Sequence, residues 1–185
     1  MAEYYLISQL PSLDAVSDGT PIPIGEERFL ELCREHLSRK ALKEIENLTI
    51  LPPMNPEPTS SALLGAWYEG ERNLRLALGK ARAEKMNKSF DIGDASMPLD
   101  ILKVAGDATE TENPLEAEKI LFAYRLAFLE KLRPMDAFSE DYLFYYGLKL
   151  KLISRMRKFD AELGGAAYRD IYDSILNGDR TEAIQ

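Results

Sequence analysis

Residues 60–86 form the stretch that most constrains how this chain can fold. The stretch contains no proline, and Thr59 or Ser60 can serve as its N-cap, so it predicts one long helix. At about 100° per residue, its large apolar side chains gather on one face. These residues are Leu63, Leu64, Trp67, Leu74, Ala77, Leu78 and Ala81. Because such a face has to be buried, we expect the chain to pack around it.

Three charged residues lie within apolar helix faces and not at their edges. Glu71 interrupts the apolar face of residues 60–86, and Arg125 and Lys149 occupy similar positions in two later helices. A buried carboxylate without a partner is strongly destabilising, so we expect Glu71 to meet Arg125 or Lys149 in an ion network between packed helices. The alternative is that these long side chains extend past the core to solvent.

The chain reads as helices joined by loops, several of them rich in proline. Residues 4–10 are an apolar run too short for periodicity to distinguish a strand from one or two helical turns. Prolines mark residues 11–25 as loop and residues 49–59 as a stiff connector. The helices expected elsewhere cover 26–37, 40–48, 60–86, 98–105, 113–132, 140–162 and 166–176, with a polar loop at 106–112.

These elements predict an all-α fold, a compact bundle of about six helices, three of them long, with proline-rich connectors. Asn113 and Ser139 are the expected N-caps of two of the long helices. The apolar residues of 113–132 cover most of its circumference, so we expect that helix to be central. We predict one helical domain over residues 1–185, with an N-terminal segment (1–58) and a main helical body (59–178).

Composition excludes several classes of function. The net charge of −8, from 23 Lys and Arg against 31 Asp and Glu, argues against a nucleic-acid-binding surface. No apolar run approaches the length of about 18 residues that a transmembrane helix needs. The N-terminus lacks the basic residues of a signal peptide, and the single cysteine, Cys33, fits a reducing compartment.

Residue patterns that carry chemistry are sparse. Cys33 and His36 have the spacing of two metal ligands, but a structural zinc site needs four, so we interpret them as a core cysteine and a surface histidine. His36 is the only histidine, which leaves no convincing Ser-His-Asp set. We therefore expect no catalytic residue, no metal and no cofactor.

Two further clusters have a structural and a functional interpretation. Lys151, Arg155 and Lys158 share one polar helix face, which is either solvated or a contact surface for an acidic partner. The tyrosines of the same helix are expected to belong to the core and not to a stacking platform. They are Tyr142, Tyr145 and Tyr146.

Three stretches resemble a bacterial family of unknown function whose genes lie within V-type ATP synthase operons. They are residues 4–13 (YYLISQLPSL), 67–82 (WYEGERNLRLALGKAR) and 141–155 (DYLFYYGLKLKLISR). The second stretch is also similar to a helical motif of the C/d subunit of V-type ATP synthases. In that motif an acid, an Asn-Leu pair and a later Arg recur, here Glu71, Asn73-Leu74 and Arg82. The chain is much shorter than the three-part, funnel-like body of the C/d subunit.

The resemblance implies a helical protein at the junction of the catalytic head and the membrane ring. We therefore expect a non-catalytic subunit or accessory protein that couples or docks the central shaft to the ring. Its partners would be other V-type ATP synthase subunits. It would be cytoplasmic and peripheral to the inner face of the cell membrane, contacting the membrane only through the complex. The alternatives are an assembly or regulatory factor of that complex, and a small helical ligand-binding protein or enzyme with a pocket around Glu71, Arg75 and Arg125.

Overall fold

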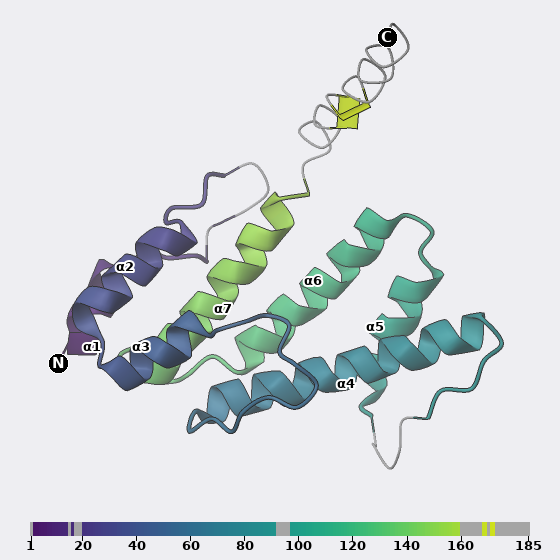
Figure 1. The fold of residues 1–185 in the computed structure, drawn as a ribbon, viewed down its shortest axis with the longest axis horizontal. Coiled ribbons are helices and arrows are strands. Elements are labelled where there is room, and N and C mark those ends of the chain that lie inside the picture. Colours follow the sequence, from purple (N-terminus) through teal and green to yellow (C-terminus); the bar gives the residue numbers. More distant parts are fainter. Residues whose placement is uncertain are drawn as a thin grey trace, which may run out of the picture. The chain divides into compact units, whose positions relative to one another are not determined.

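The computed structural model describes residues 2–14, 16, 20–91, 97–159, 168, 169, 171 and 172. In this part of the chain all regular structure is helical, which confirms the all-α fold class (Figure 1). Residues 4–10, left open by the sequence, belong mostly to a helix. The helices are α1 (Ala2–Gln9), α2 (Glu26–His36), α3 (Arg39–Glu46), α4 (Ala62–Lys85), α5 (Leu99–Glu110), α6 (Pro114–Lys131) and α7 (Glu140–Arg157).

The chain divides into two compact units, residues 1–154 and residues 155–185. The expected N-terminal segment, 1–58, and most of the expected main body fall together in the first unit, where residues of both pack in the same apolar cluster. The helix expected over 166–176 lies largely outside the described residues, as do Gly164 and Gly165, the expected end of the preceding helix. Of the helices described, none combines the length and the apolar content needed to cross a membrane.

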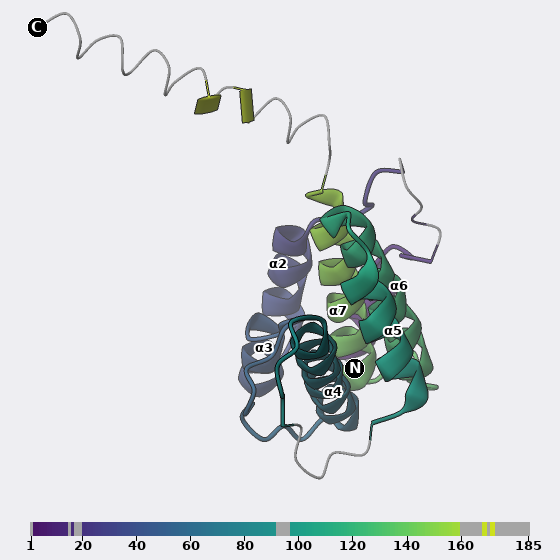
Figure 2. The same ribbon diagram turned by 90° about the vertical axis from the view of Figure 1, so that its right-hand side faces the viewer.

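Helix α7 is the central helix of the first unit. It runs between α2–α3 on one side and α6 on the other in both views (Figure 1 and Figure 2). Eight consecutive residues, 143–150, are buried, together with Leu152 and Ile153. The expectation that residues 113–132 form the central helix is wrong, because α6 buries only one face. That face carries Leu121, Arg125 and Leu129, while Ala123 and Ala127 are exposed.

Two apolar clusters form the core of the first unit. The larger cluster joins α1, α2, α3 and α7 to the start of α4 and the end of α6, and it contains Trp67 and Leu129. The smaller cluster joins the rest of α4 to α5 and the first half of α6, and it contains Leu74 and Leu121. Helices α4 and α6 therefore cross from one cluster to the other and link them.

Several element boundaries differ from the sequence-based expectation. Helix α7 ends at Arg157, whereas the expected helix continues to residue 162. The N-cap of α4 is Ser61, and not Thr59 or Ser60: Ser61 Oγ accepts a hydrogen bond from Leu64 N at 3.1 Å. The same hydroxyl donates to Asp141 Oδ1 at 2.6 Å, which ties the start of α4 to the start of α7. Helix α5 continues through residues 106–110, where a loop was expected, because Ala105 and Ala108 are buried in the smaller cluster.

Gly70 and Gly65 of α4 offer a matched test of this packing. A Cβ at Gly70 would collide with the Phe128 ring, whereas a Cβ at Gly65 would meet nothing within 4 Å. We expect Gly70→Ala to lower the free energy of unfolding by about 1–3 kcal/mol. Gly65→Ala should raise it by about 0.5–1 kcal/mol, since alanine favours helix. Urea unfolding followed by the fluorescence of Trp67, whose ring stacks 6.0 Å from that of Phe128, measures both. Equal effects of the two substitutions would contradict this packing.

Candidate functional site

Glu71 and Arg125 form a buried ion pair between α4 and α6. Arg125 Nε donates to Glu71 Oε2 at 2.9 Å, and Arg125 Nη2 donates to Glu71 Oε1 at 2.8 Å. The residues are only 2% and 7% exposed. Two partly exposed neighbours extend the pair: Arg75 Nε lies 3.6 Å from Glu71, and Glu118 lies 3.8 Å from Arg125. We call these four residues the α4–α6 ion cluster.

The electrostatics of this cluster keep Arg125 charged. Burial by itself lowers the pKa of Arg125, but the hydrogen bonds and the negative charge of Glu71 outweigh it, so the pKa is raised. The two parallel hydrogen bonds also fix the planes of both groups. Glu71, Arg75 and Arg125, around which a pocket was the alternative expectation, thus contact one another through their charged groups.

Lys149 belongs to a second cluster, built from the loop after α1, the end of α6 and α7. Its ammonium donates to Asp14 Oδ1 at 2.5 Å and to Glu130 Oε1 at 2.7 Å. The Tyr145 hydroxyl donates to the same Glu130 oxygen at 2.8 Å and accepts from Lys149 at 3.3 Å. Arg133 lies 3.6 Å from Asp14 and faces the Tyr145 ring. We call these five residues the Lys149 cluster.

The structure thus divides the expected network of Glu71, Arg125 and Lys149 into two separate clusters. Glu71 meets Arg125, while the carboxylates that Lys149 bonds are Asp14 and Glu130. Sequence reasoning missed both of these acids. Asp14 lies in an irregular loop where periodicity gives no signal, and Glu130 borders the buried face of α6 near its end. The polar environment of Lys149 could be expected, but not the identity of its partners.

Hydrogen bonds and burial shift the pKa values of Lys149, Asp14 and Tyr145 away from neutral pH. Burial lowers the pKa of Lys149, but its hydrogen bonds to Asp14, Glu130 and Tyr145 raise it more, so the net pKa is raised. The hydrogen bond from Lys149 is the main reason that the pKa of Asp14 is lowered. Burial raises the pKa of Tyr145 to about 12. At neutral pH Lys149 is a cation and not a free amine nucleophile.

The remaining sequence candidates lie apart from these clusters. Cys33 is fully buried, and burial raises the pKa of its thiol to about 12. His36 is half-buried, with its Nε2 atom 3.4 Å from Gln9 Nε2. No group of three or more His, Cys, Asp or Glu side chains that could hold a metal ion occurs among the described residues.

The basic face expected from Lys151, Arg155 and Lys158 is divided between the two units. Lys151 is half-buried in the first unit, where its ammonium donates to Glu26 Oε2 at 3.1 Å. Arg155 and Lys158 belong to the second unit, in which the Arg155 guanidinium lies over the Phe159 ring. Tyr145 and Tyr146 are core residues, as expected: both are buried, and the Tyr146 hydroxyl donates to Pro11 O at 2.9 Å.

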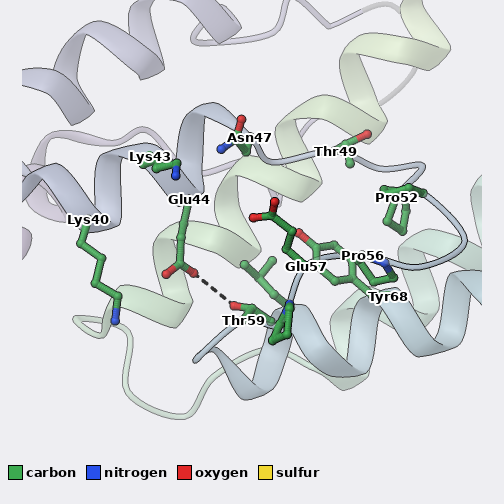
Figure 3. Close-up of a pocket in the computed structure, with 13 residues that line it drawn as sticks. Lys40, Lys43, Glu44, Asn47, Thr49, Pro52, Pro56, Glu57, Thr59 and Tyr68 are labelled. Atoms are coloured by element: carbon green, nitrogen blue, oxygen red, sulfur yellow. Dashed lines mark hydrogen bonds between the residues drawn. The ribbon is translucent and has the colours of Figure 1, made fainter.

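A cavity of about 580 Å³ lies between α3, the proline-rich connector and the start of α4 (Figure 3). Glu44 accepts a hydrogen bond from Thr59 at 3.1 Å across one side of it. Burial and the nearby Glu44 charge raise the pKa of Tyr68 in its wall. Two lysines and two glutamates balance its charge. The lining residues are Lys40, Lys43, Glu44, Asn47, Thr49, Pro52, Pro53, Pro56, Glu57, Pro58, Thr59, Leu64 and Tyr68.

Comparison with known proteins gives no match to a family model, to a curated protein or to a solved structure.

The α4–α6 ion cluster can be tested with a double-mutant cycle. Arg125→Met leaves the Glu71 carboxylate buried without its bidentate partner, so we expect it to lower the free energy of unfolding by about 3–5 kcal/mol. The double variant Glu71→Met/Arg125→Met should recover most of that loss, because no buried charge is then left unpaired. Urea unfolding followed by far-UV circular dichroism gives these values.

The exposed pair of Arg34 and Glu46, whose atoms lie 3.2 Å apart, supplies the matched control. Arg34→Met should cost no more than about 1 kcal/mol, as is usual for surface ion pairs. If Arg125→Met cost no more than Arg34→Met, the buried pair would not have the structural role assigned to it.

Tyr145 should make stability depend on alkaline pH. Its pKa is raised from 10.0 to about 12 in the folded chain, so the folded state binds this proton more tightly than the unfolded state. Its contribution to stability is therefore complete below pH 10 and is lost as the pH rises towards 12. We expect the urea midpoint of Tyr145→Phe to fall less between pH 9 and about pH 11 than that of the unsubstituted chain. Tyr5→Phe, at an exposed position, should leave the pH profile unchanged. Parallel profiles for all three proteins would disprove this assignment.

Proposed function

We propose that this chain is a non-catalytic subunit or accessory protein of a V-type ATP synthase, which couples or docks the central shaft to the membrane ring. The observation that carries the proposal is the resemblance of residues 4–13, 67–82 and 141–155 to a family encoded in V-type ATP synthase operons. A protein in that position acts through its surfaces and its stiffness. It needs no reaction centre of its own.

The positions of these three stretches in the fold support the proposal. Leu6, Trp67 and Phe144, one from each stretch, are buried in the same apolar cluster. The first and third stretches are joined directly by the hydrogen bond from the Tyr146 hydroxyl to Pro11 O. Each of the three stretches therefore contributes buried residues to the same apolar cluster.

The two ion clusters support a stiff body. The α4–α6 ion cluster joins two helices, and the Lys149 cluster joins a loop to two helices through charge-assisted hydrogen bonds. Such contacts make sliding of one helix along another costly, because each shift would leave a buried charge unpaired. A body that transmits force or holds a fixed distance between partners benefits from that resistance.

The cavity beside α3 favours a second candidate, a small helical ligand-binding protein. Its volume of about 580 Å³ is in the range of small-molecule sites. Its wall combines proline rings and Tyr68 with several polar side chains, which is a composition that ligand pockets use.

Affinity purification from the cells that make this protein separates the candidates. With a tag on the chain and mild solubilisation of the membranes, we expect head and ring subunits to co-purify in a fixed ratio. The purified fraction should also hydrolyse ATP. An untagged strain processed in parallel is the control. Recovery with incomplete complexes only would indicate an assembly or regulatory factor. Recovery of the chain without any of these subunits would refute the proposal, and a melting temperature raised by a metabolite would then favour the ligand-binding candidate.

A further inference from the structure

Four large apolar side chains are exposed where α1 faces the loop between α6 and α7. Tyr4 and Tyr5 come from α1 and are 55% and 67% exposed, Phe138 is 47% exposed, and Met135 is fully exposed. The rings of Tyr4 and Phe138 stack with their centroids 4.6 Å apart, which brings the two segments into contact. We call these four residues the Tyr4–Phe138 face.

This face is not needed to complete the core. Helix α1 already contributes the fully buried Leu6 to the larger apolar cluster, and Ile7 packs against the same cluster. Single exposed apolar residues are common on protein surfaces. The stacked pair of Tyr4 and Phe138 is different, because it joins exposed aromatic side chains from segments about 130 positions apart in sequence, and exposed apolar patches mark interaction sites.

The segments that build the face are poor in basic residues. In α1 and the loop between α6 and α7, the one basic residue is Arg133, whose guanidinium lies 3.6 Å from Asp14 and 3.9 Å from Glu130 in the Lys149 cluster. No lysine or arginine precedes Arg28, and none lies between Arg133 and Lys149. Asp136 and Glu140 flank Phe138 in the sequence, and Asp136 Oδ1 accepts a hydrogen bond from Phe138 N at 2.9 Å, which holds this carboxylate beside the face. The Tyr4–Phe138 face is therefore an apolar surface with an acidic rim.

We propose that the Tyr4–Phe138 face is a docking site for a segment of another protein that carries large apolar side chains beside lysine or arginine. The apolar side chains would cover the two tyrosines, Met135 and Phe138, and the cations would meet the acidic rim. A second copy of this chain fits less well, since a symmetric contact would bring the same acids together. An anionic membrane would repel the same rim. Such docking does not require that the chain belong to a V-type ATP synthase.

Two synthetic peptides of 18 residues serve as probes. Both place leucine on one helix face, and the other face carries lysine in the first peptide and glutamate in the second. We expect the full chain to bind the leucine–lysine peptide at least about tenfold more tightly than the leucine–glutamate peptide, measured by isothermal titration calorimetry. Tyr4→Ser/Phe138→Ser should weaken binding of the leucine–lysine peptide at least about tenfold, because it removes the stacked aromatic anchors.

Met86→Ser is the matched control, since Met86 is an exposed apolar residue at the C-terminal end of α4, whereas the opposite end of α4 contacts the start of α7. It should leave the affinity within about twofold. Circular dichroism and urea unfolding establish that both variants fold. Equal binding by the double variant and the control would overturn the proposal, as would an absence of binding. The proposal would also be overturned if the unsubstituted chain formed a dimer, or bound phosphatidylcholine–phosphatidylglycerol vesicles, and only the double variant failed to do so. In that case the face would bind a second copy of the chain or a membrane.

Discussion

The buried pair of Glu71 and Arg125 is the contact on which the arrangement of the first unit depends. It lies where α4 and α6 cross from the larger apolar cluster to the smaller one. On α4 it separates Trp67 from Leu74, and on α6 it separates Leu121 from Leu129. Apolar contacts alone would tolerate a shift of one helix along the other, since leucine packs acceptably against many neighbours. A shift of one turn would leave a carboxylate and a guanidinium buried apart, which is far more costly.

The Lys149 cluster applies the same constraint to the other side of the core. It fixes the loop after α1 and the end of α6 against the central helix α7. The shared oxygen of Glu130 receives both the Lys149 ammonium and the Tyr145 hydroxyl, so the positions of two α7 side chains are set by one carboxylate. Helix α7 can therefore be buried along much of its length while it still carries a lysine, because the buried Lys149 ammonium bonds to the partly exposed carboxylates of Asp14 and Glu130.

The sequence predicted the α4–α6 pair in part because two signals coincided. Helical periodicity showed that Glu71 and Arg125 point inwards, and the cost of an unpaired buried charge required a partner for each. The choice between Arg125 and Lys149 could not be made, since periodicity orients a side chain about its own helix but does not place two helices side by side. The same limit explains why Asp14, which lies in a loop, was missed, and why Ser61 caps α4 in place of the expected Thr59 or Ser60.

The sequence-based expectations for α5 and α6 were wrong because tertiary packing outweighed the local sequence signals. Gly106 and the polar residues after it favoured a loop, yet α5 continues because Ala105 and Ala108 fit against α4. The apolar circumference of α6 suggested a central helix, but alanines made up part of that circumference, and small side chains can face solvent at little cost. Long apolar and aromatic side chains, which α7 has in greater number, are the better guide to the centre of a bundle.

The internal use of cations has a consequence for the outer surface. Arg125 is buried with Glu71, Lys149 bonds the partly exposed Asp14 and Glu130, and Lys151 donates to Glu26, so these three cations are balanced by at least as many carboxylates. The excess of acids in the sequence is therefore carried by other positions, among them the loop that contains Asp136 and Phe138. The charges that hold the helices in register thus balance one another locally, so a preference of the surface for basic partners depends on the separate acids that lie outside these clusters.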